Sequence, residues 1–348
     1  MNGFGLIEKL EQKQALEKEE WIELLEHRTP QAEALLFAKA RDKQEAYFGK
    51  QIYIRGLIEF TNYCRNDCYY CGIRRSNGNA HRYRLMEEEI LDCCRYGYSL
   101  GFRTFVLQGG EDSFFTEEKM IRLIERIRRD FPDCAITLSI GERERAEYEA
   151  YFRAGANRFL LRHETANEAH YRHLHPTELS LAHRKQCLRE LREIGYQVGS
   201  GMMVGSPGQT TADLAEDLMF LQELQPHMVG IGPFIPHQDT PFRAEQAGTL
   251  EDTLFLLAAI RLMLPKVLLP ATTALSTIHP DGRKRGILAG ANVVMPNLSP
   301  PKNRKYYSLY DHKRCMGDEA AEGLSLLRAE MEEIGYQVTI ARGDALME

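Results

Sequence analysis

The first fifty residues alternate charged and apolar positions at the spacing of helices. Leu6 and Leu10, for example, lie about one helical turn apart and share one apolar face. The pattern predicts three amphipathic helices, at 4–16, 18–27 and 30–47. Helices of this kind bury their apolar stripe against a larger body. We therefore expect residues 1–50 to form a helical cap with no chemistry of its own.

From Gln51 onward, short apolar runs alternate with longer amphipathic segments. The runs have the length of buried strands, and they lie at 52–60, 103–107, 134–139, 157–161, 197–204, 228–231, 266–270 and 291–295. The segments between them have the period of helices, and they lie at 86–100, 116–130, 142–154, 181–195, 210–224, 249–263 and 281–289. Strands that alternate with helices in this number predict a closed, parallel (β/α)8 barrel of the TIM type. An open, doubly wound sheet is the alternative.

No segment between the strands resembles a linker between domains. The longest polar, proline-rich stretch, 296–310, comes after the last strand, and one more helix is predicted at 319–333. We expect the barrel to span 51–310 and a C-terminal extension that contains this helix to span 311–348.

Composition narrows the possible classes of protein. Of the 348 residues, 43% are hydrophobic and 27% are charged, which is typical of a globular protein with a sizeable core. The net charge of −6 argues against a nucleic-acid binder, because such proteins carry an excess of basic residues. No apolar stretch has the length of a membrane span. Eight cysteines without a signal peptide point to a reducing cytoplasm.

Three cysteines, Cys64, Cys68 and Cys71, lie close together directly after the first predicted strand. An iron-sulfur cube normally takes four cysteine ligands, so three thiolates with no fourth nearby leave one iron open to another ligand. A disulfide scaffold does not fit an odd triplet. A structural zinc site needs a fourth Cys or His at close spacing, and none follows Cys71. The spacing CxxxCxxC therefore favours a 4Fe-4S cluster, with zinc as the alternative.

Other polar groups follow the predicted strands, where the active sites of such barrels are found. The loop after the second strand begins with Gly109, Gly110 and Glu111. Paired glycines let a backbone approach a ligand closely. Arg162 and Glu164 follow the fourth strand. Because buried charges need partners, we expect these two side chains either to form a salt bridge with each other or to bind a polar ligand. The planar fork of Arg184 suits a carboxylate, and a structural ion pair is again the alternative.

The cysteine spacing, with Tyr70 before the third cysteine and the Gly-Gly-Glu run after the second strand, resembles the signature of the radical S-adenosylmethionine (SAM) superfamily. In that superfamily SAM chelates the open iron, and an electron from the cluster splits its sulfonium to give a 5'-deoxyadenosyl radical. The resemblance implies an enzyme with one 4Fe-4S cluster on Cys64, Cys68 and Cys71. It also implies that SAM is held by Gly109, Gly110, Glu111, Ser139, Glu164 and Arg184.

Longer runs resemble one family of this superfamily, the FeFe-hydrogenase maturase HydE. They lie at 64–77, 160–167, 205–210, 228–241, 270–274 and 290–297. Biotin synthase and methylornithine synthase share the cysteine triad but match these runs less closely. The resemblance implies that the radical acts on a small iron-cysteine unit with carbonyl and cyanide ligands during H-cluster assembly. Other maturases and an electron donor would be its partners. An amino-acid mutase of the methylornithine type and a non-catalytic iron-sulfur scaffold remain alternatives.

Two further expectations follow from the same resemblance. An anionic substrate inside the barrel would be lined by Arg162, Thr272, Thr273, Tyr306, Tyr307 and Tyr310. Some HydE proteins carry a second cluster site with the spacing CxxxxxxxCxxC, and here Cys315 is followed at those positions by Gly323 and Leu326. One thiolate cannot hold a cluster, so we expect no second cluster.

Overall fold

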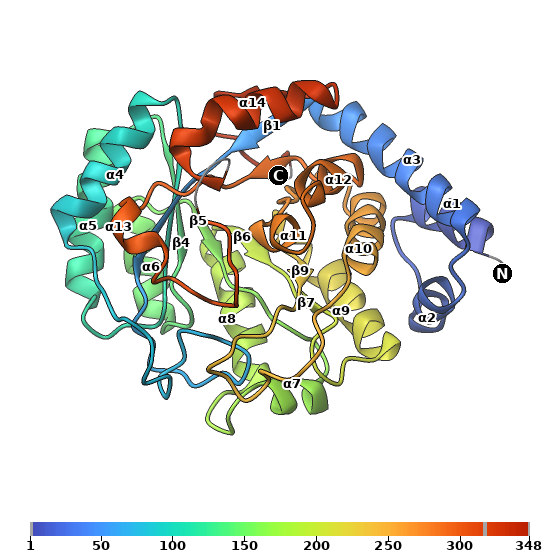
Figure 1. Cartoon of the computed structure of the whole chain (residues 1–348), viewed down its shortest axis with the longest axis horizontal. Coiled ribbons are helices and arrows are strands. Elements are labelled where there is room, and N and C mark those ends of the chain that lie inside the picture. The colour runs from blue at the N-terminus through green and yellow to red at the C-terminus, as the bar shows by residue number, and fades with distance from the viewer. Residues whose placement is uncertain (1–2, 316–318, 347–348) are drawn as a thin grey trace.

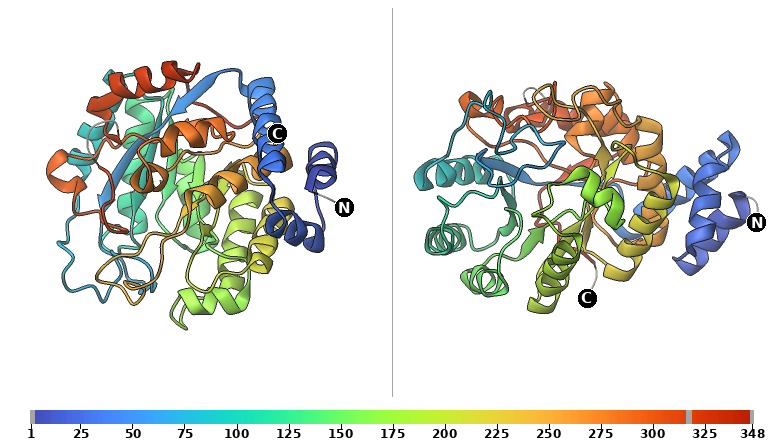
Figure 2. Two further views of the ribbon diagram at one scale, coloured as in Figure 1. Left: turned by 45° about the vertical axis from the view of Figure 1, so that its right-hand side comes forward. Right: turned by 90° about the horizontal axis from the view of Figure 1, so that it is seen from below.

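The computed structural model describes residues 3–315 and 319–346. Three helices cover the range of the expected cap, namely α1 (Gly3–Lys13), α2 (Lys18–Glu26) and α3 (Pro30–Phe48). Thr29 caps α3 because its side-chain oxygen accepts a hydrogen bond from the amide of Ala32. The three helices pack on one side of the molecule against α9 (Thr211–Leu224) and α10 (Leu250–Met263) (Figures 1 and 2).

A parallel sheet forms the centre of the molecule. Its first strand has two parts, β1 (Gln51–Ile54) and β2 (Gly56–Thr61). The next strands follow β2 across the sheet in chain order, and each pairs with the one before it. They are β3 (Thr104–Gly109), β4 (Ala135–Ser139), β5 (Arg158–Leu160), β6 (Gln197–Ser200) and β8 (Met228–Val229). Two short strands, β7 (Met203–Val204) and β9 (Gly232–Pro233), continue β6 and β8 and pair with each other.

The sheet closes on itself through two further segments. Leu268 bridges in parallel to Met228, and Pro270 bridges to Val293. The last segment, β10 (Val293–Val294), then pairs in parallel with β1. All eight predicted strands thus take part in a closed (β/α)8 barrel. This final pairing rules out the open sheet.

The predicted outer helices are present within one to three residues of the expected ends. Besides α9 and α10 they are α4 (Glu87–Ser99), α5 (Glu117–Asp130), α6 (Arg145–Ala154), α8 (Leu181–Ile194) and α12 (Gly282–Leu288). Three shorter helices were not predicted, because they contain too few turns to show a period: α7 (Glu168–Leu174), α11 (Thr273–Ile278) and α13 (Pro301–Arg304).

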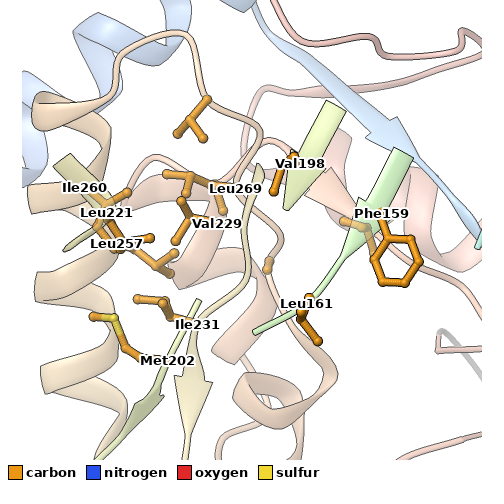
Figure 3. Packing of buried hydrophobic residues seen from close by; sticks show 14 of the residues in the cluster. Phe159, Leu161, Val198, Met202, Leu221, Val229, Ile231, Leu257, Ile260 and Leu269 are labelled. Atoms are coloured by element: carbon orange, nitrogen blue, oxygen red, sulfur yellow. The ribbon is translucent and has the colours of Figure 1, made fainter. Parts of the chain in front are cut away.

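The core lies between the barrel strands and the helices around them. Figure 3 shows Val229 and Leu269 of the barrel facing Leu221 of α9 and Leu257 and Ile260 of α10. All five side chains are fully buried, and each contributes roughly 1.5–3 kcal/mol of hydrophobic stabilisation. Among the described residues, no helix is both long enough and apolar enough to cross a membrane.

The C-terminal segment covers the end of the barrel at which the strands begin. After α14 (Leu324–Glu333), β11 (Gln337–Thr339) pairs in parallel with β1. Arg158, at the start of β5, donates hydrogen bonds to the carbonyl oxygen of Gly343 (3.1 Å) and to Asp344 (2.7 Å). The expected helix at 319–333 is present in its second half, whereas the sequence did not predict β11 or this cover. The opposite end of the barrel is the end that carries the cysteine loop.

Candidate active site

The three cysteines lie on the loop that follows β2, at the C-terminal end of the barrel strands. A network of short hydrogen bonds folds this loop. Asp67 accepts from Arg74 Nε (2.8 Å) and from the amide of Ser76 (2.9 Å). The guanidinium of Arg74 holds the pKa of the Asp67 carboxyl far below its usual range. Arg82 donates to the carbonyl oxygens of Ile73 (2.8 Å) and Arg74 (2.6 Å). The loop therefore has a defined shape without any disulfide.

Burial makes the three thiols weak acids. It raises the pKa of Cys71 to about 12, and it raises that of Cys64 less strongly. For Cys68 burial and the two neighbouring thiols together raise the pKa well above its ordinary value. All three are free and half-buried. Among the described residues no three His, Cys, Asp or Glu side chains converge on one metal ion. Binding iron would therefore release protons from thiols that are otherwise neutral.

The glycines after β3 lie directly against the cysteine loop. A Cβ at Gly110 would be 2.2 Å from the carbonyl oxygen of Tyr63 and 2.7 Å from Cβ of Cys64. Glu111 is buried and is held on the outer side of the loop. Its carboxylate accepts from Arg65 Nε (2.9 Å) and from the amide of Glu142 (3.0 Å). The backbone at Gly110 is thus as close to the cluster loop as packing allows.

Arg162 and Glu164 contact each other at the same end of the barrel. Nη2 of Arg162 is 3.1 Å from Oε2 of Glu164, but the geometry is not that of a hydrogen bond, and both atoms are buried without another partner. His163 between them contacts α9, whereas Glu164 is close enough to Cys68 and Cys71 to help raise the pKa of both thiols. The contact between Arg162 and Glu164 fits the predicted salt bridge, yet it leaves polar atoms available to a ligand.

Arg184 and Ser139 occupy different environments. Arg184, on α8, is buried and forms an ion pair with Glu142, while its Nη1 donates to the carbonyl oxygen of Arg162 (2.8 Å). The structural ion pair considered for this arginine is therefore present. Its partner Glu142 was not among the predicted site residues. Ser139 ends β4 beside Gln108 of β3. Both residues lie at the C-terminal end of the barrel.

The candidates for substrate contact do not form one cluster. Thr272 donates to the carbonyl oxygen of Ile231 (3.3 Å) and Thr273 to Glu319 (2.9 Å). Tyr306 stacks on His81, with 4.0 Å between ring centroids. Of the other two, Tyr307 is buried and Tyr310 is half-buried, and burial raises the pKa of each hydroxyl well above its usual value. Tyr306 thus belongs to the wall next to the cysteine loop, whereas Tyr307 and Tyr310 lie nearer the interior.

The structure adds charged groups that the sequence reasoning missed. Glu59 of β2 is fully buried, forms an ion pair with Lys313, and accepts from Asn297 Nδ2 (2.8 Å). Arg55 is equally buried, and two of its guanidinium nitrogens have no partner. The sequence contained a signal for both residues. Each is a charged residue within an apolar strand, and buried charges need a partner or a function.

A cavity at this end has a volume of about 270 Å³ and is lined by Glu111 and Asp112. Its lining is mostly charged, and includes Arg65, Glu142, Arg143 and His183. It does not include the cysteines. The cavity is therefore a pocket beside the cysteine loop, separate from Arg162 and Glu164.

The residues at this end fit a cluster with one open iron together with a polar ligand. Three thiols share a loop, and no side chain at Gly110 separates that loop from the end of β3. The unpartnered atoms of Arg162 and Glu164 can bind the charged and hydroxyl groups of a small molecule. A barrel with cysteines after its first strand and a glycine pair after its second defines the class of radical SAM proteins.

Comparison with known proteins agrees with this class. The radical SAM superfamily profile matches residues 58–221. The chain is 42% identical, over 96% of its length and 95% of the relative, to the [FeFe] hydrogenase maturase subunit HydE of Thermotoga maritima. It is 28% identical over 87% of its length, and 84% of the relative, to 3-methylornithine synthase of Methanosarcina acetivorans. The chain belongs to the HydE family of radical SAM proteins.

Solved structures share the same fold. Methylornithine synthase (PylB) superposes with a TM-score of 0.85 at 26% identity, over 96% of this chain and 97% of that one. The hydrogenase maturase HydG superposes with a TM-score of 0.81 at 21% identity, over 97% of this chain and 76% of that one. Both comparisons confirm the barrel prediction.

Proposed function

We propose that this chain is a radical SAM enzyme of hydrogenase maturation. Cys64, Cys68 and Cys71 hold a single 4Fe-4S cluster, and the residues around it hold SAM, namely Gly109, Gly110, Glu111, Ser139, Glu164 and Arg184. Bound together, the cluster and SAM supply a 5'-deoxyadenosyl radical. The observation that carries the proposal is the presence, at one end of a closed barrel, of three free thiols on one loop, the bare Gly110 backbone beside that loop, and the unpartnered atoms of Arg162 and Glu164.

The protein's own groups then bind and orient the reactants. The Arg184–Glu142 ion pair is anchored to the carbonyl oxygen of Arg162, so it holds the strand end that carries Glu164. Arg162 provides an unpartnered donor at this end, and the hydroxyls of Tyr307 and Tyr310, beside Gln108 and Thr277, add polar groups. The C-terminal segment covers the opposite end of the closed barrel, an arrangement that favours exclusion of water from a reactive radical.

We propose a small, anionic iron unit carrying cysteine, carbonyl and cyanide ligands as the substrate, on its way to the H-cluster. Family membership supports this choice, as does the cationic and hydroxyl character of the predicted lining, Arg162, Thr272, Thr273, Tyr306, Tyr307 and Tyr310. Other maturases and an electron donor are the proposed partners, and a reducing cytoplasm is the proposed location. An amino-acid substrate of the methylornithine type is the second candidate, supported by the relatives of that activity.

We propose no second cluster. Leu326, at a position where some relatives have a cysteine, is exposed on α14, and Gly323 directly precedes this helix. Cys315 is left without a second thiol at the expected spacing. A chain with about four irons supports the proposal, and a chain with about eight contradicts it.

Anaerobic reconstitution with iron and sulfide tests the main proposal. The wild-type chain should bind about four irons and, when reduced, cleave SAM to 5'-deoxyadenosine, and Cys64→Ala should lose both. Cys94→Ala is the matched control, because Cys94 is buried on α4 outside the site. Zinc binding without SAM cleavage would contradict the proposal. Activation of apo-hydrogenase in a mixture lacking other HydE then separates the maturase from a lysine-isomerising mutase.

A further inference from the structure

Glu164 has a backbone conformation that its own sequence does not favour. Its φ of 66° lies in the left-handed region, which non-glycine residues rarely adopt. Its amide donates to the carbonyl oxygen of Gly201 (3.1 Å), and its carbonyl oxygen accepts from the amide of Met203 (3.2 Å). A conformation of this kind persists only when surrounding contacts fix it. These two hydrogen bonds hold the peptide of Glu164 itself, and the residues on either side have further anchors.

A buried polar group on α9 holds both flanks of Glu164. His163 is fully buried, with Nδ1 3.0 Å from Oγ of Ser200 and Nε2 3.3 Å from Oδ1 of Asp217. The same Oδ1 accepts a hydrogen bond from the amide of Ala166. Asp217 therefore contacts the residue before Glu164 and the residue two positions after it.

Burial disfavours a charge on either member of the pair formed by His163 and Asp217. Burial lowers the pKa of His163 to about 3 and raises that of Asp217 well above its ordinary value. One oxygen of Asp217, Oδ2, is buried without a partner, and an ionised oxygen in that place would be strongly unfavourable. With the carboxyl group protonated, Oδ1 still accepts from the amide of Ala166, and Nε2 of His163 lies near the same oxygen without the geometry of a hydrogen bond. Asparagine can take the place of this acid.

We propose that Asp217 and His163 are positioning residues that fix the left-handed conformation of Glu164 and thereby its contact with SAM. The inference rests on the proposed role of Glu164 in binding SAM. An ordinary buried pair would only stabilise the packing of α9 on the barrel. A positioning pair must in addition change SAM affinity through Glu164, and this difference can be measured.

The test compares Asp217→Leu with Asp217→Asn on the reconstituted protein. Leucine removes the acceptor of the Ala166 amide and the polar contact with His163, whereas asparagine retains both. We expect SAM to bind roughly tenfold more weakly to Asp217→Leu, as expected for loss of a hydrogen bond to a charged group, and nearly normally to Asp217→Asn. Ser200→Ala, a milder change at the other nitrogen of His163, should weaken binding in the same direction. Iron content should remain unchanged in all three.

A double-mutant cycle with Glu164→Gln decides how Asp217 acts. If Asp217 acts through Glu164, Asp217→Leu should weaken SAM binding little further in the Glu164→Gln background. Asn292→Leu is the matched control, since Asn292 is fully buried at the start of β10 and binds Arg261. It should lower thermal stability without changing SAM affinity.

The outcomes separate this inference from the proposed function. If Glu164→Gln weakens SAM binding but Asp217→Leu and Ser200→Ala do not, the positioning role is wrong while the SAM site stands. Additive effects on SAM affinity in the cycle would also overturn the positioning role. Equal losses of SAM affinity in Asp217→Leu and Asn292→Leu would do the same. If Glu164→Gln leaves SAM affinity unchanged, the assignment of Glu164 is wrong, and the positioning role fails with it.

Discussion

Gly110→Ala is the sharpest test of how the cluster loop is built. The new methyl carbon would lie 2.2 Å from the carbonyl oxygen of Tyr63 and 2.7 Å from Cβ of Cys64. Ordinary carbon contacts have separations of about 3.5 Å, so the two backbone segments must move apart by about 1 Å. Neither neighbour is the end of a flexible side chain that could turn away. The movement therefore falls on the residue next to the first cysteine and on the cysteine itself.

The expected effect is larger on chemistry than on stability. Overpacking of this kind costs roughly 1–3 kcal/mol of folding free energy, which a barrel of this size can tolerate. A displacement of about 1 Å at a reacting centre lowers the rate about 100-fold. We therefore expect Gly110→Ala to fold, to bind less iron than the wild type, and to cleave SAM about 100-fold more slowly.

Iron and sulfide content after anaerobic reconstitution, and the rate of 5'-deoxyadenosine formation, measure this effect. Gly78→Ala is the control, because a Cβ at Gly78 meets nothing within 4 Å although this glycine also belongs to the segment after the cysteines. Full iron content together with wild-type SAM cleavage in Gly110→Ala would show that the close approach between these loops has no role in holding the cluster.

Three further predictions concern buried polar groups. Arg55→Met should raise the unfolding temperature, because two guanidinium nitrogens are buried without partners; an unchanged or lower temperature would contradict this. Arg184→Met should destabilise the protein by about 3–5 kcal/mol in denaturant titrations by leaving Glu142 unpaired, and adding Glu142→Gln should recover part of the loss. Burial lowers the pKa of His175 to about 3, so below pH 6.5 the unfolded chain takes up the proton first and stability falls. The cluster-free variant His175→Gln keeps an acceptor for Tyr70. Between pH 6.5 and 5 its free energy of unfolding should fall by about 2 kcal/mol less than that of the wild type. An equal dependence of stability on pH in the two proteins would refute the lowered pKa of His175.

Local patterns were sufficient to predict the barrel. Each strand is a short apolar run, and helix ends such as Thr116, which caps α5 through the amide of Lys119, follow from residue chemistry alone. The pairing of β11 with β1 was not predictable in this way. Its sequence, Gln337–Thr339, is short and only partly buried, and nothing in it specifies a partner nearly three hundred residues earlier.

The same distinction between local pattern and long-range contact applies to the site. The cysteine spacing and the glycine pair lie within short stretches of chain, so the sequence alone could suggest them. The partner of Arg184 could not be predicted, because Glu142 lies on another loop and its contact depends on the closed barrel. Ion pairs of this kind join strand ends that are adjacent only after folding. The sequence can therefore indicate which residues carry the chemistry, but it does not indicate what holds them in place.

Gly110 and Glu164 show why the positions at the strand ends are the least determined by local sequence. At Gly110 the requirement is steric, because another loop occupies the space of a side chain. At Glu164 it is conformational, because a residue with a side chain adopts a left-handed backbone. In both cases a distant segment contacts the position: the cysteine loop at Gly110, and Gly201 and Met203 at Glu164, with α9 as the further support that we propose. Functional sites are where local preference and native structure are expected to disagree. Substitutions in α9 far from any ligand should therefore alter SAM binding, whereas equally buried substitutions in α5 should alter stability alone.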